Sequence, residues 1–270
     1  MKLSVVIPTR NEAANIAACV RSFGTAASRG EVEVIVVDNS SSDDTKAIAA
    51  SLGARVFDQG NERCAQRNRG WREACADWVL FLDADMVFPG KTLDEALAIC
   101  GSPDSADAWY IHEVRAGDGI RVKARNFERG FYDGTCIDGL RMVRRSFLER
   151  VGGYDEALVA CEDWDLDRRL VSAGARTGMM RGHLVHNEAK VSLARFLAKK
   201  SYYSRSVGLY RAKWNEDAIV RKQFGVGYRY FGVFFGNGGW RRVLRHPVLF
   251  AVMMLERVAV GVVYLAGRRG

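Results

Sequence analysis

Val32-Glu-Val-Ile-Val-Val-Asp38, followed at once by Asn39-Ser-Ser-Ser-Asp-Asp-Thr45, is the stretch that decides the class of fold. The first part is a β-branched, apolar run, which predicts a buried strand over residues 32–37 that is closed by Asp38. The second part is rich in residues that cap helices, and it introduces a predicted helix that runs to about Leu52. A strand that passes directly into a helix is the repeating unit of an α/β fold.

The same alternation continues on both sides of this stretch. Residues 3–7 predict the first strand, and a helical pattern follows over about 12–27. Further strands are predicted at 54–57 and 78–82, with a helix over 63–76 between them. Four such units imply a mostly parallel sheet with helices on both faces. In sheets of this kind, ligands bind beyond the carboxyl ends of the strands.

Charge divides the chain of 270 residues into two parts. Residues 1–180 hold 23 basic and 28 acidic side chains, whereas residues 181–270 hold 17 and 4. With 48% hydrophobic and 27% charged residues, the composition excludes a disordered chain. We expect one domain over residues 1–190 and a basic, partly apolar helical extension over residues 191–270.

The segment after the first predicted strand, Pro8-Thr-Arg-Asn-Glu12, lacks the glycines of a dinucleotide-binding loop. The strand over 78–82 leads into Asp83-Ala-Asp85, where two carboxylates would enter one crevice. Mg²⁺ and Mn²⁺ prefer such oxygen ligands. Two solvated turn acids are the alternative interpretation, as helix capping is for Asp38.

Beyond residue 105 the alternation loosens, with strands predicted at 109–115 and 141–143 and a helix over 162–173. This helix opens with Glu162-Asp163-Trp-Asp-Leu, whose acids either complement the helix dipole or supply a general base. His186 is either an ordinary structural histidine or an additional metal ligand.

Taken in order, these segments resemble family-2 glycosyltransferases. The resemblance covers about residues 3–190, and its motifs lie at residues 4–12, 36–45, 67–70, 81–85, 144–147, 151–155 and 162–166. It implies a GT-A fold, which is a Rossmann-like α/β fold, together with a nucleotide-sugar donor, most often a UDP-sugar, and Mn²⁺ or Mg²⁺.

The resemblance also implies roles for individual residues. On the donor side, Pro8, Thr9 and Glu12 would line the nucleoside pocket, with Asp38 on the base and Arg67 on the nucleotide side. On the metal side, Asp83 would face the ribose or the metal, and Asp85 would ligate the metal. His186 would add a metal or diphosphate contact. Asp163 would be the catalytic base of an inverting displacement.

The implied reaction is a single sugar transfer in glycolipid, glycan or cell-envelope assembly, because the chain lacks the multiple spans of processive synthases. A catalytically silent, membrane-associated scaffold of the same fold is one alternative. A nucleotidyltransferase is another, although it would normally have a glycine-rich loop where this chain has Pro8-Thr-Arg-Asn.

The basic extension is expected to meet a membrane or a lipid-linked acceptor rather than nucleic acid, since no nucleic-acid motif accompanies the charge. Residues 247–266 are long enough to span a bilayer, but Glu256 and Arg257 at the middle favour a helix that lies in the interface or docks against a partner. A soluble helical cap with a solvated basic face, with this helix buried or dimer-forming, is the alternative. A basic helix over 193–213 could hold an acceptor phosphate through five of its side chains, Lys199, Lys200, Tyr202, Tyr203 and Arg205.

The cysteines and the N-terminus bear on the compartment. Six cysteines without a CxxC pair are typical of reduced thiols, and the first apolar run is too short for the core of a signal peptide. We therefore expect a cytoplasmic protein at the cytoplasmic face of a membrane.

Overall fold

The computed structural model describes residues 1–60, 62–187 and 207–266. The chain forms two compact units, Met1–Glu113 with Gly139–Asn187, and Val114–Asp138 with Glu188–Gly270. The domain boundary expected at 190/191 lies outside the described residues.

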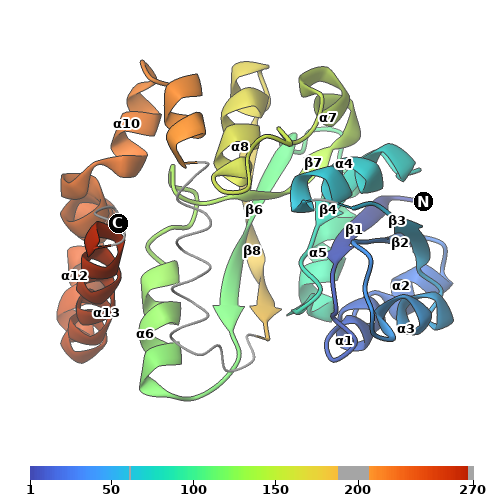
Figure 1. The fold of residues 1–270 in the computed structure, drawn as a ribbon, viewed down its shortest axis with the longest axis horizontal. Helices are drawn as coiled ribbons and strands as arrows, with labels where there is room; N and C mark the ends of the chain where they lie inside the picture. The colour runs from blue at the N-terminus through green and yellow to red at the C-terminus, as the bar shows by residue number, and fades with distance from the viewer. Residues whose placement is uncertain (61, 188–206, 267–270) are drawn as a thin grey trace. The chain divides into compact units, whose positions relative to one another are not determined.

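The first unit is built on one sheet, whose first half is parallel (Figure 1). Strand β1 (Leu3–Thr9) lies between β2 (Val32–Asp38) and β4 (Trp78–Phe81), and β3 (Arg55–Asp58) pairs with β2. The pairing register sets Thr9 beside Asp38, so the carboxyl ends of β1 and β2 meet at one edge. The four strands predicted from the apolar runs are therefore confirmed.

The second half of the sheet is antiparallel. Strand β7 (Leu140–Arg144) pairs with β4 and with β6 (Ala108–Arg115), and β8 (Thr177–His186) pairs with the short β5 (Met86–Val87). The full order is β3-β2-β1-β4-β7-β6-β8-β5. The predicted α/β class is confirmed, with a sheet that is mixed rather than parallel throughout.

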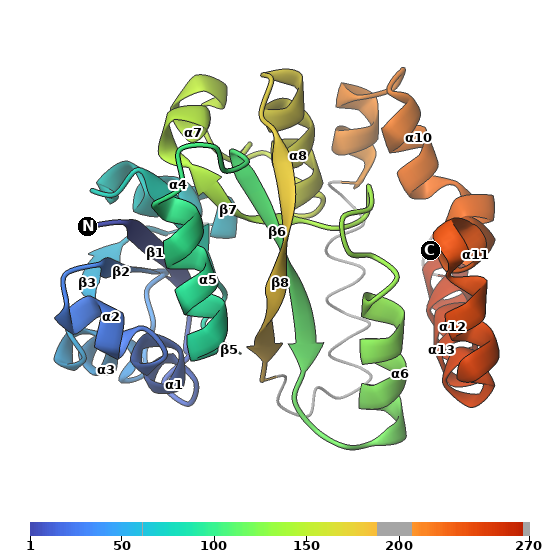
Figure 2. The ribbon, with the colours of Figure 1, turned by 180° about the vertical axis from the view of Figure 1, so that it is seen from behind.

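Helices cover both faces of the sheet, as Figures 1 and 2 show. One face carries α1 (Ile16–Arg21), α2 (Gly24–Ser28), α3 (Thr45–Ser51) and α5 (Gly90–Cys100), and the other carries α4 (Arg63–Glu73), α7 (Arg145–Val151) and α8 (Glu162–Ser172). Strands β1, β2 and β4 are buried along their whole length because each side of the sheet there faces a helical layer.

The helix expected over residues 12–27 is divided into α1 and α2. Ser22 lies between them, and its hydroxyl donates to the carbonyl oxygen of Cys19 at 2.6 Å. Such a local bond competes with the regular ladder of the helix. The next residue, Phe23, is fully buried in the core, which fixes the break in the chain.

The described part of the second unit is helical. It contains α6 (Ile120–Arg129), a helical stretch over 207–213, α10 (Ala218–Phe224), a π-helix (Tyr228–Gly232), α11 (Val233–Phe235), a 3₁₀ turn (Gly236–Gly238), α12 (Trp240–Arg245) and α13 (Pro247–Ala266). Phe131 makes edge contacts with Phe127 and Phe234, at ring-centroid distances of 5.0 and 5.2 Å. Of the predicted basic helix over 193–213, residues 193–206 lie outside the described residues. None of the helices in the described ranges combines the length and the hydropathy needed to cross a bilayer.

Candidate active site

The carboxyl ends of β1 and β2 are tied together by buried polar side chains. Thr9 donates from its hydroxyl to Asp38 Oδ1 at 2.8 Å, and the backbone N–H of Ser41 donates to Asp38 Oδ2 at 2.7 Å. Gln66 of α4 donates to the carbonyl oxygens of Thr9 and Val37. Pro8, Thr9 and Asp38, expected on the nucleoside side, are all buried. Asp38 therefore holds the loop that follows β2, and its nucleotide contact stays a prediction.

Three acids concentrate negative potential just beyond this edge. Burial raises the pKa of Glu12, and the charges of Asp85 and Asp83 add to the rise. The Glu12 side chain accepts a hydrogen bond from Asn15, and its backbone N–H donates to Thr45. Because like charges near an acid oppose its ionisation, a cation bound beside these carboxylates would lower their mutual repulsion.

Arg67 joins two motifs that lie far apart in the sequence. Its side chain is 1% exposed, and its two terminal nitrogens lie 3.0 Å from Asp83 Oδ1 and 3.0 Å from Asp163 Oδ1. Glu162 lies 3.5 Å from the nitrogen that binds Asp163. Burial opposes the charge of Arg67, but the surrounding groups, which include these carboxylates, hold its pKa above the ordinary value. Because the guanidinium is so deeply buried, it offers little surface to a nucleotide, which is the contact expected from the sequence. In the structure it links Asp83 to Asp163.

A second buried arginine, Arg141 of β7, completes the neutralisation of Asp83. It lies 3.7 Å from Asp83 Oδ2 and 3.3 Å from Glu113. Burial would raise the pKa of Asp83, yet Arg67 and Arg141 hold it well below its usual range. Because both oxygens of Asp83 face guanidinium groups, Asp83 is less suited than Asp85 to bind a metal ion.

His186, at the end of β8, lies between two acids. Its Nε2 is 3.0 Å from Asp85 Oδ2, and its Nδ1 is 2.8 Å from Glu113 Oε1. Burial would lower the pKa of His186, but the hydrogen bonds to Asp85 and Glu113 raise it to about 10. The predicted closeness of His186 to the acid pair is thus found in the structure, although the ring is held there as an ion pair.

The donor set partly fits a divalent cation. Cis ligands of an octahedral ion with bonds of 2.0–2.1 Å are about 3 Å apart, which matches the separation of His186 and Asp85. Within the described ranges, however, no group of three or more His, Cys, Asp or Glu side chains is arranged to hold a metal. Water and diphosphate oxygens would have to supply the remaining ligands.

One acid of helix α8 is more exposed to solvent than the other acids of that helix. Asp165 is fully buried and pairs with Arg169 at 2.8 Å, while Asp167 accepts from the hydroxyl of Tyr110. Asp163 is 34% exposed, and its Oδ2 accepts no hydrogen bond from the described residues. Gly139 lies against it, where a Cβ would come within 3.2 Å of the Asp163 Cβ. Asp163 is therefore the one acid of this helix that is not buried.

Arg141 and Glu113 are site residues that sequence reasoning missed. Both lie in strands predicted from their neighbours, at 141–143 and 109–115, where a charged side chain has to be paired. The need of each charged side chain for a partner was the signal in the sequence that could have pointed to these two residues. Strand β8, which carries His186, was not predicted at all.

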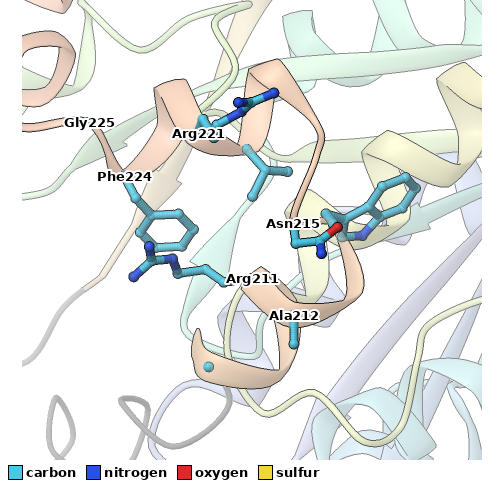
Figure 3. Close-up of a pocket in the computed structure, with 9 residues that line it drawn as sticks. Arg211, Ala212, Asn215, Arg221, Phe224 and Gly225 are labelled. Atoms are coloured by element: carbon cyan, nitrogen blue, oxygen red, sulfur yellow. The ribbon is translucent and has the colours of Figure 1, made fainter.

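The second unit contains a pocket of about 590 Å³ that includes none of these residues. Its lining combines arginines and aromatic rings: Gly208, Arg211, Ala212, Trp214, Asn215, Val220, Arg221, Phe224 and Gly225. Figure 3 shows Arg211 beside Phe224, and its guanidinium lies 5.5 Å from the ring centroid.

A parallel half-sheet that ends in an Asp-x-Asp segment, joined to an antiparallel half-sheet that brings a further acid and a histidine, defines a GT-A glycosyltransferase. Residues 4–152 match the family model described as glycosyl transferase family 2. The chain belongs to this family, and it is a glycosyltransferase.

Individual relatives agree with this assignment. A Mycobacterium bovis protein named PGL/p-HBAD biosynthesis glycosyltransferase is 31% identical over 188 residues, which are 63% of this chain and 69% of the relative. Two solved structures share the fold. TarS of S. aureus, in complex with UDP, has a TM-score of 0.58 and 20% identity, over 85% of this chain and 72% of TarS. The mannosyltransferase PcManGT of Pyrobaculum calidifontis, in complex with GDP-Man and Mn²⁺, has a TM-score of 0.62 and 18% identity, over 99% of this chain and 79% of PcManGT.

Proposed function

We propose that this glycosyltransferase moves one sugar from a nucleotide-sugar, with a UDP-sugar as the expected donor, to an acceptor hydroxyl with inversion. The observation that carries the proposal is Arg67, which holds Asp163 and Asp83 at 3.0 Å each. A base from one segment is thereby fixed beside the acids that face the diphosphate.

Inversion needs the attacking hydroxyl and the leaving diphosphate on opposite sides of the anomeric carbon. In this proposal the acceptor oxygen forms a bond to that carbon while the bond to the diphosphate oxygen breaks. The nucleoside diphosphate leaves with the electron pair, and the acceptor proton passes to Asp163. Its Oδ2 is the oxygen available for this proton, since Oδ1 is bound by Arg67.

A divalent cation, Mn²⁺ or Mg²⁺, would be held by Asp85 and His186, and it would neutralise the charge that develops on the departing diphosphate. The relative with GDP-Man and Mn²⁺ shares this fold, which supports the assignment. Arg67 and Arg141 keep Asp83 ionised at the same edge. Glu12 lies close enough to Asp85 and Asp83 for their charges to raise its pKa.

The acceptor is proposed to be a glycan or a lipid-linked molecule of glycolipid or cell-envelope assembly, reached at the cytoplasmic face of a membrane. The mycobacterial relative is named for PGL/p-HBAD biosynthesis, and residues 191–270 carry the basic charge that suits an anionic acceptor or lipid. Arg211 and Arg221 of the pocket in Figure 3 are charged groups suited to an acceptor phosphate.

Two substitutions test the catalytic assignment. Asp163→Asn retains an oxygen for Arg67 but removes the proton acceptor, so transfer should fall by about 10²-fold or more while donor binding persists. Asp85→Ala should instead weaken metal-dependent donor binding. Turnover would be measured with nucleotide-sugars in Mn²⁺ or Mg²⁺, and binding by calorimetry.

Asp94→Asn is the matched control, because Asp94 is an exposed acid of α5 outside the cluster. It should leave both quantities unchanged. Full turnover in Asp163→Asn would remove that residue from the mechanism. Absence of any sugar transfer by the unsubstituted protein, with donor still bound, would favour the silent scaffold.

A further inference from the structure

Helix α13 carries its charges on the side that faces its own unit. Glu256 accepts from Arg121 Nε at 2.6 Å and from Arg125 Nε at 3.4 Å, both on α6. Arg257 pairs with Glu128, the acid of the same helix, and also donates to a backbone carbonyl at 2.7 Å. The two charges in the middle of α13 are therefore satisfied within the second unit.

The opposite side of α13 is apolar and exposed. Val248, Leu255 and Val258 are 65%, 72% and 52% exposed, and Ala251 and Ala259 are exposed as well. The spacing of three and four residues places them on one stripe along the helix. A surface helix of a globular protein normally turns its polar side to water, so α13 has the reverse arrangement. We call Val248, Ala251, Leu255 and Val258 the outer stripe.

Cationic and aromatic side chains lie directly before this stripe, on α12. Trp240 is 45% exposed, Arg241 and Arg245 are exposed, and neither arginine forms an ion pair within the described ranges. Residues 207–266 hold nine Lys and Arg against three acids. Exposed apolar side chains beside Trp and unpaired Arg are the combination found in helices that lie in a membrane interface.

We propose that the outer stripe of α13 docks on an anionic membrane surface, with the helix lying in the plane of the interface and Arg241 and Arg245 at the lipid phosphates. This deepens the membrane contact proposed above, names the contacting side chains, and does not depend on the catalytic assignment. Arginine side chains near an anionic lipid surface add electrostatic attraction to the apolar contact.

A second copy of the chain would also cover an apolar stripe, but the charges disfavour it. In a parallel pair of α13 helices, the basic α12 segments of the two copies would lie near each other, with no acid in α12 to offset them. Like charges brought together cost free energy, whereas anionic lipid headgroups neutralise the same arginines.

The test is vesicle flotation with the full chain and without donor. The protein should float with vesicles of phosphatidylcholine and phosphatidylglycerol and stay behind with phosphatidylcholine alone. Leu255→Glu puts a charge into the stripe and should lower binding about tenfold or more, since burying one leucine contributes about 1.5–3 kcal/mol. Substituting Arg241 and Arg245 by Gln should lower binding to the anionic vesicles and weaken its salt dependence.

Leu209→Glu is the matched control, because Leu209 is 55% exposed and belongs to another helix. It should bind as the unsubstituted protein does. Circular dichroism should show both variants folded, as exposed positions allow. Flotation of Leu255→Glu equal to that of the control would overturn the proposal. So would a concentration-dependent dimer that Leu255→Glu abolishes in a protein that never floats.

Discussion

Arg67 shows how much of the site depends on one side chain. It is 1% exposed, and it holds carboxylates that come from the end of β4 and from the start of α8. Without its charge, Asp83 would lose the largest of the interactions that offset its burial, and the pKa of Asp83 would rise. The ionised state of Asp83 is therefore a property of the folded unit rather than of its own motif alone.

His186 gives the site a defined pH dependence. Its pKa is raised to about 10 by Asp85 and Glu113, so the stability that the charged ring contributes is complete below the unfolded value of about 6.5 and is lost as pH rises towards 10. In the presence of EDTA, the free energy of unfolding should fall by about 1–3 kcal/mol more in the unsubstituted protein than in His186→Gln between pH 6.5 and 9. Urea unfolding at the two pH values measures this. Parallel losses in both proteins would mean that the ring is neutral when folded.

Among the elements, those that were predicted are the ones whose pattern is local. The runs of β1, β2 and β4 are mostly apolar and buried throughout, because both faces of the sheet are covered, and such runs can be recognised in the sequence alone. Strand β8 was missed because it reads Thr-Gly-Met-Met-Arg-Gly-His-Leu-Val-His, with two glycines and no regular alternation of buried and exposed residues. Its pairing with the two-residue β5 is a long-range contact that no local pattern encodes.

The candidate site divides in the same way. Asp83, Asp85 and Asp163 stand out because acids follow strands or open a helix. Arg141 and Glu113 stand within strands, and their pairing across β6 and β7 depends on the fold. Sequence reasoning also could not tell that Arg67 pairs with Asp83 and Asp163, since that depends on its burial, and its nucleotide contact stays a prediction.

Helix α4 lies so close to β1 that one position of it requires glycine. A Cβ on Gly70 would come within 2.2 Å of Val6 Cγ1. Gly70→Ala should therefore destabilise the first unit by about 1–3 kcal/mol, even though alanine has the better helix propensity. Gly24→Ala in α2 is the control, because a Cβ there meets nothing within 4 Å. Thermal unfolding compares them, and equal midpoints would show that β1 and α4 can separate without cost.

At the scale of the whole molecule, the excess of basic over acidic side chains lies in the second unit. The acids proposed to bind the cation and to act as the catalytic base lie in the first unit, where Arg67 and Arg141 offset their charge. The unpaired arginines and the outer stripe of α13 lie in the second unit. The net charge of +8 is therefore no indication of nucleic-acid binding, because it is the sum of the charges of an acidic first unit and a basic second unit.

Ligand binding should stabilise the first unit in a way that separates the roles of its acids. A ligand at about 100 times its dissociation constant adds about 2.7 kcal/mol, which raises the midpoint of a unit of this size by about 5–10 °C. We expect a nucleoside diphosphate with Mn²⁺ to give such a shift in a thermal-shift panel of nucleotides and nucleotide-sugars, and EDTA to reduce it. Asp85→Ala should lose the part that depends on metal, whereas Asp163→Asn should keep it, because Asp163 is bound by Arg67 and not by His186. An equal shift in Asp85→Ala, with and without metal, would place the cation elsewhere.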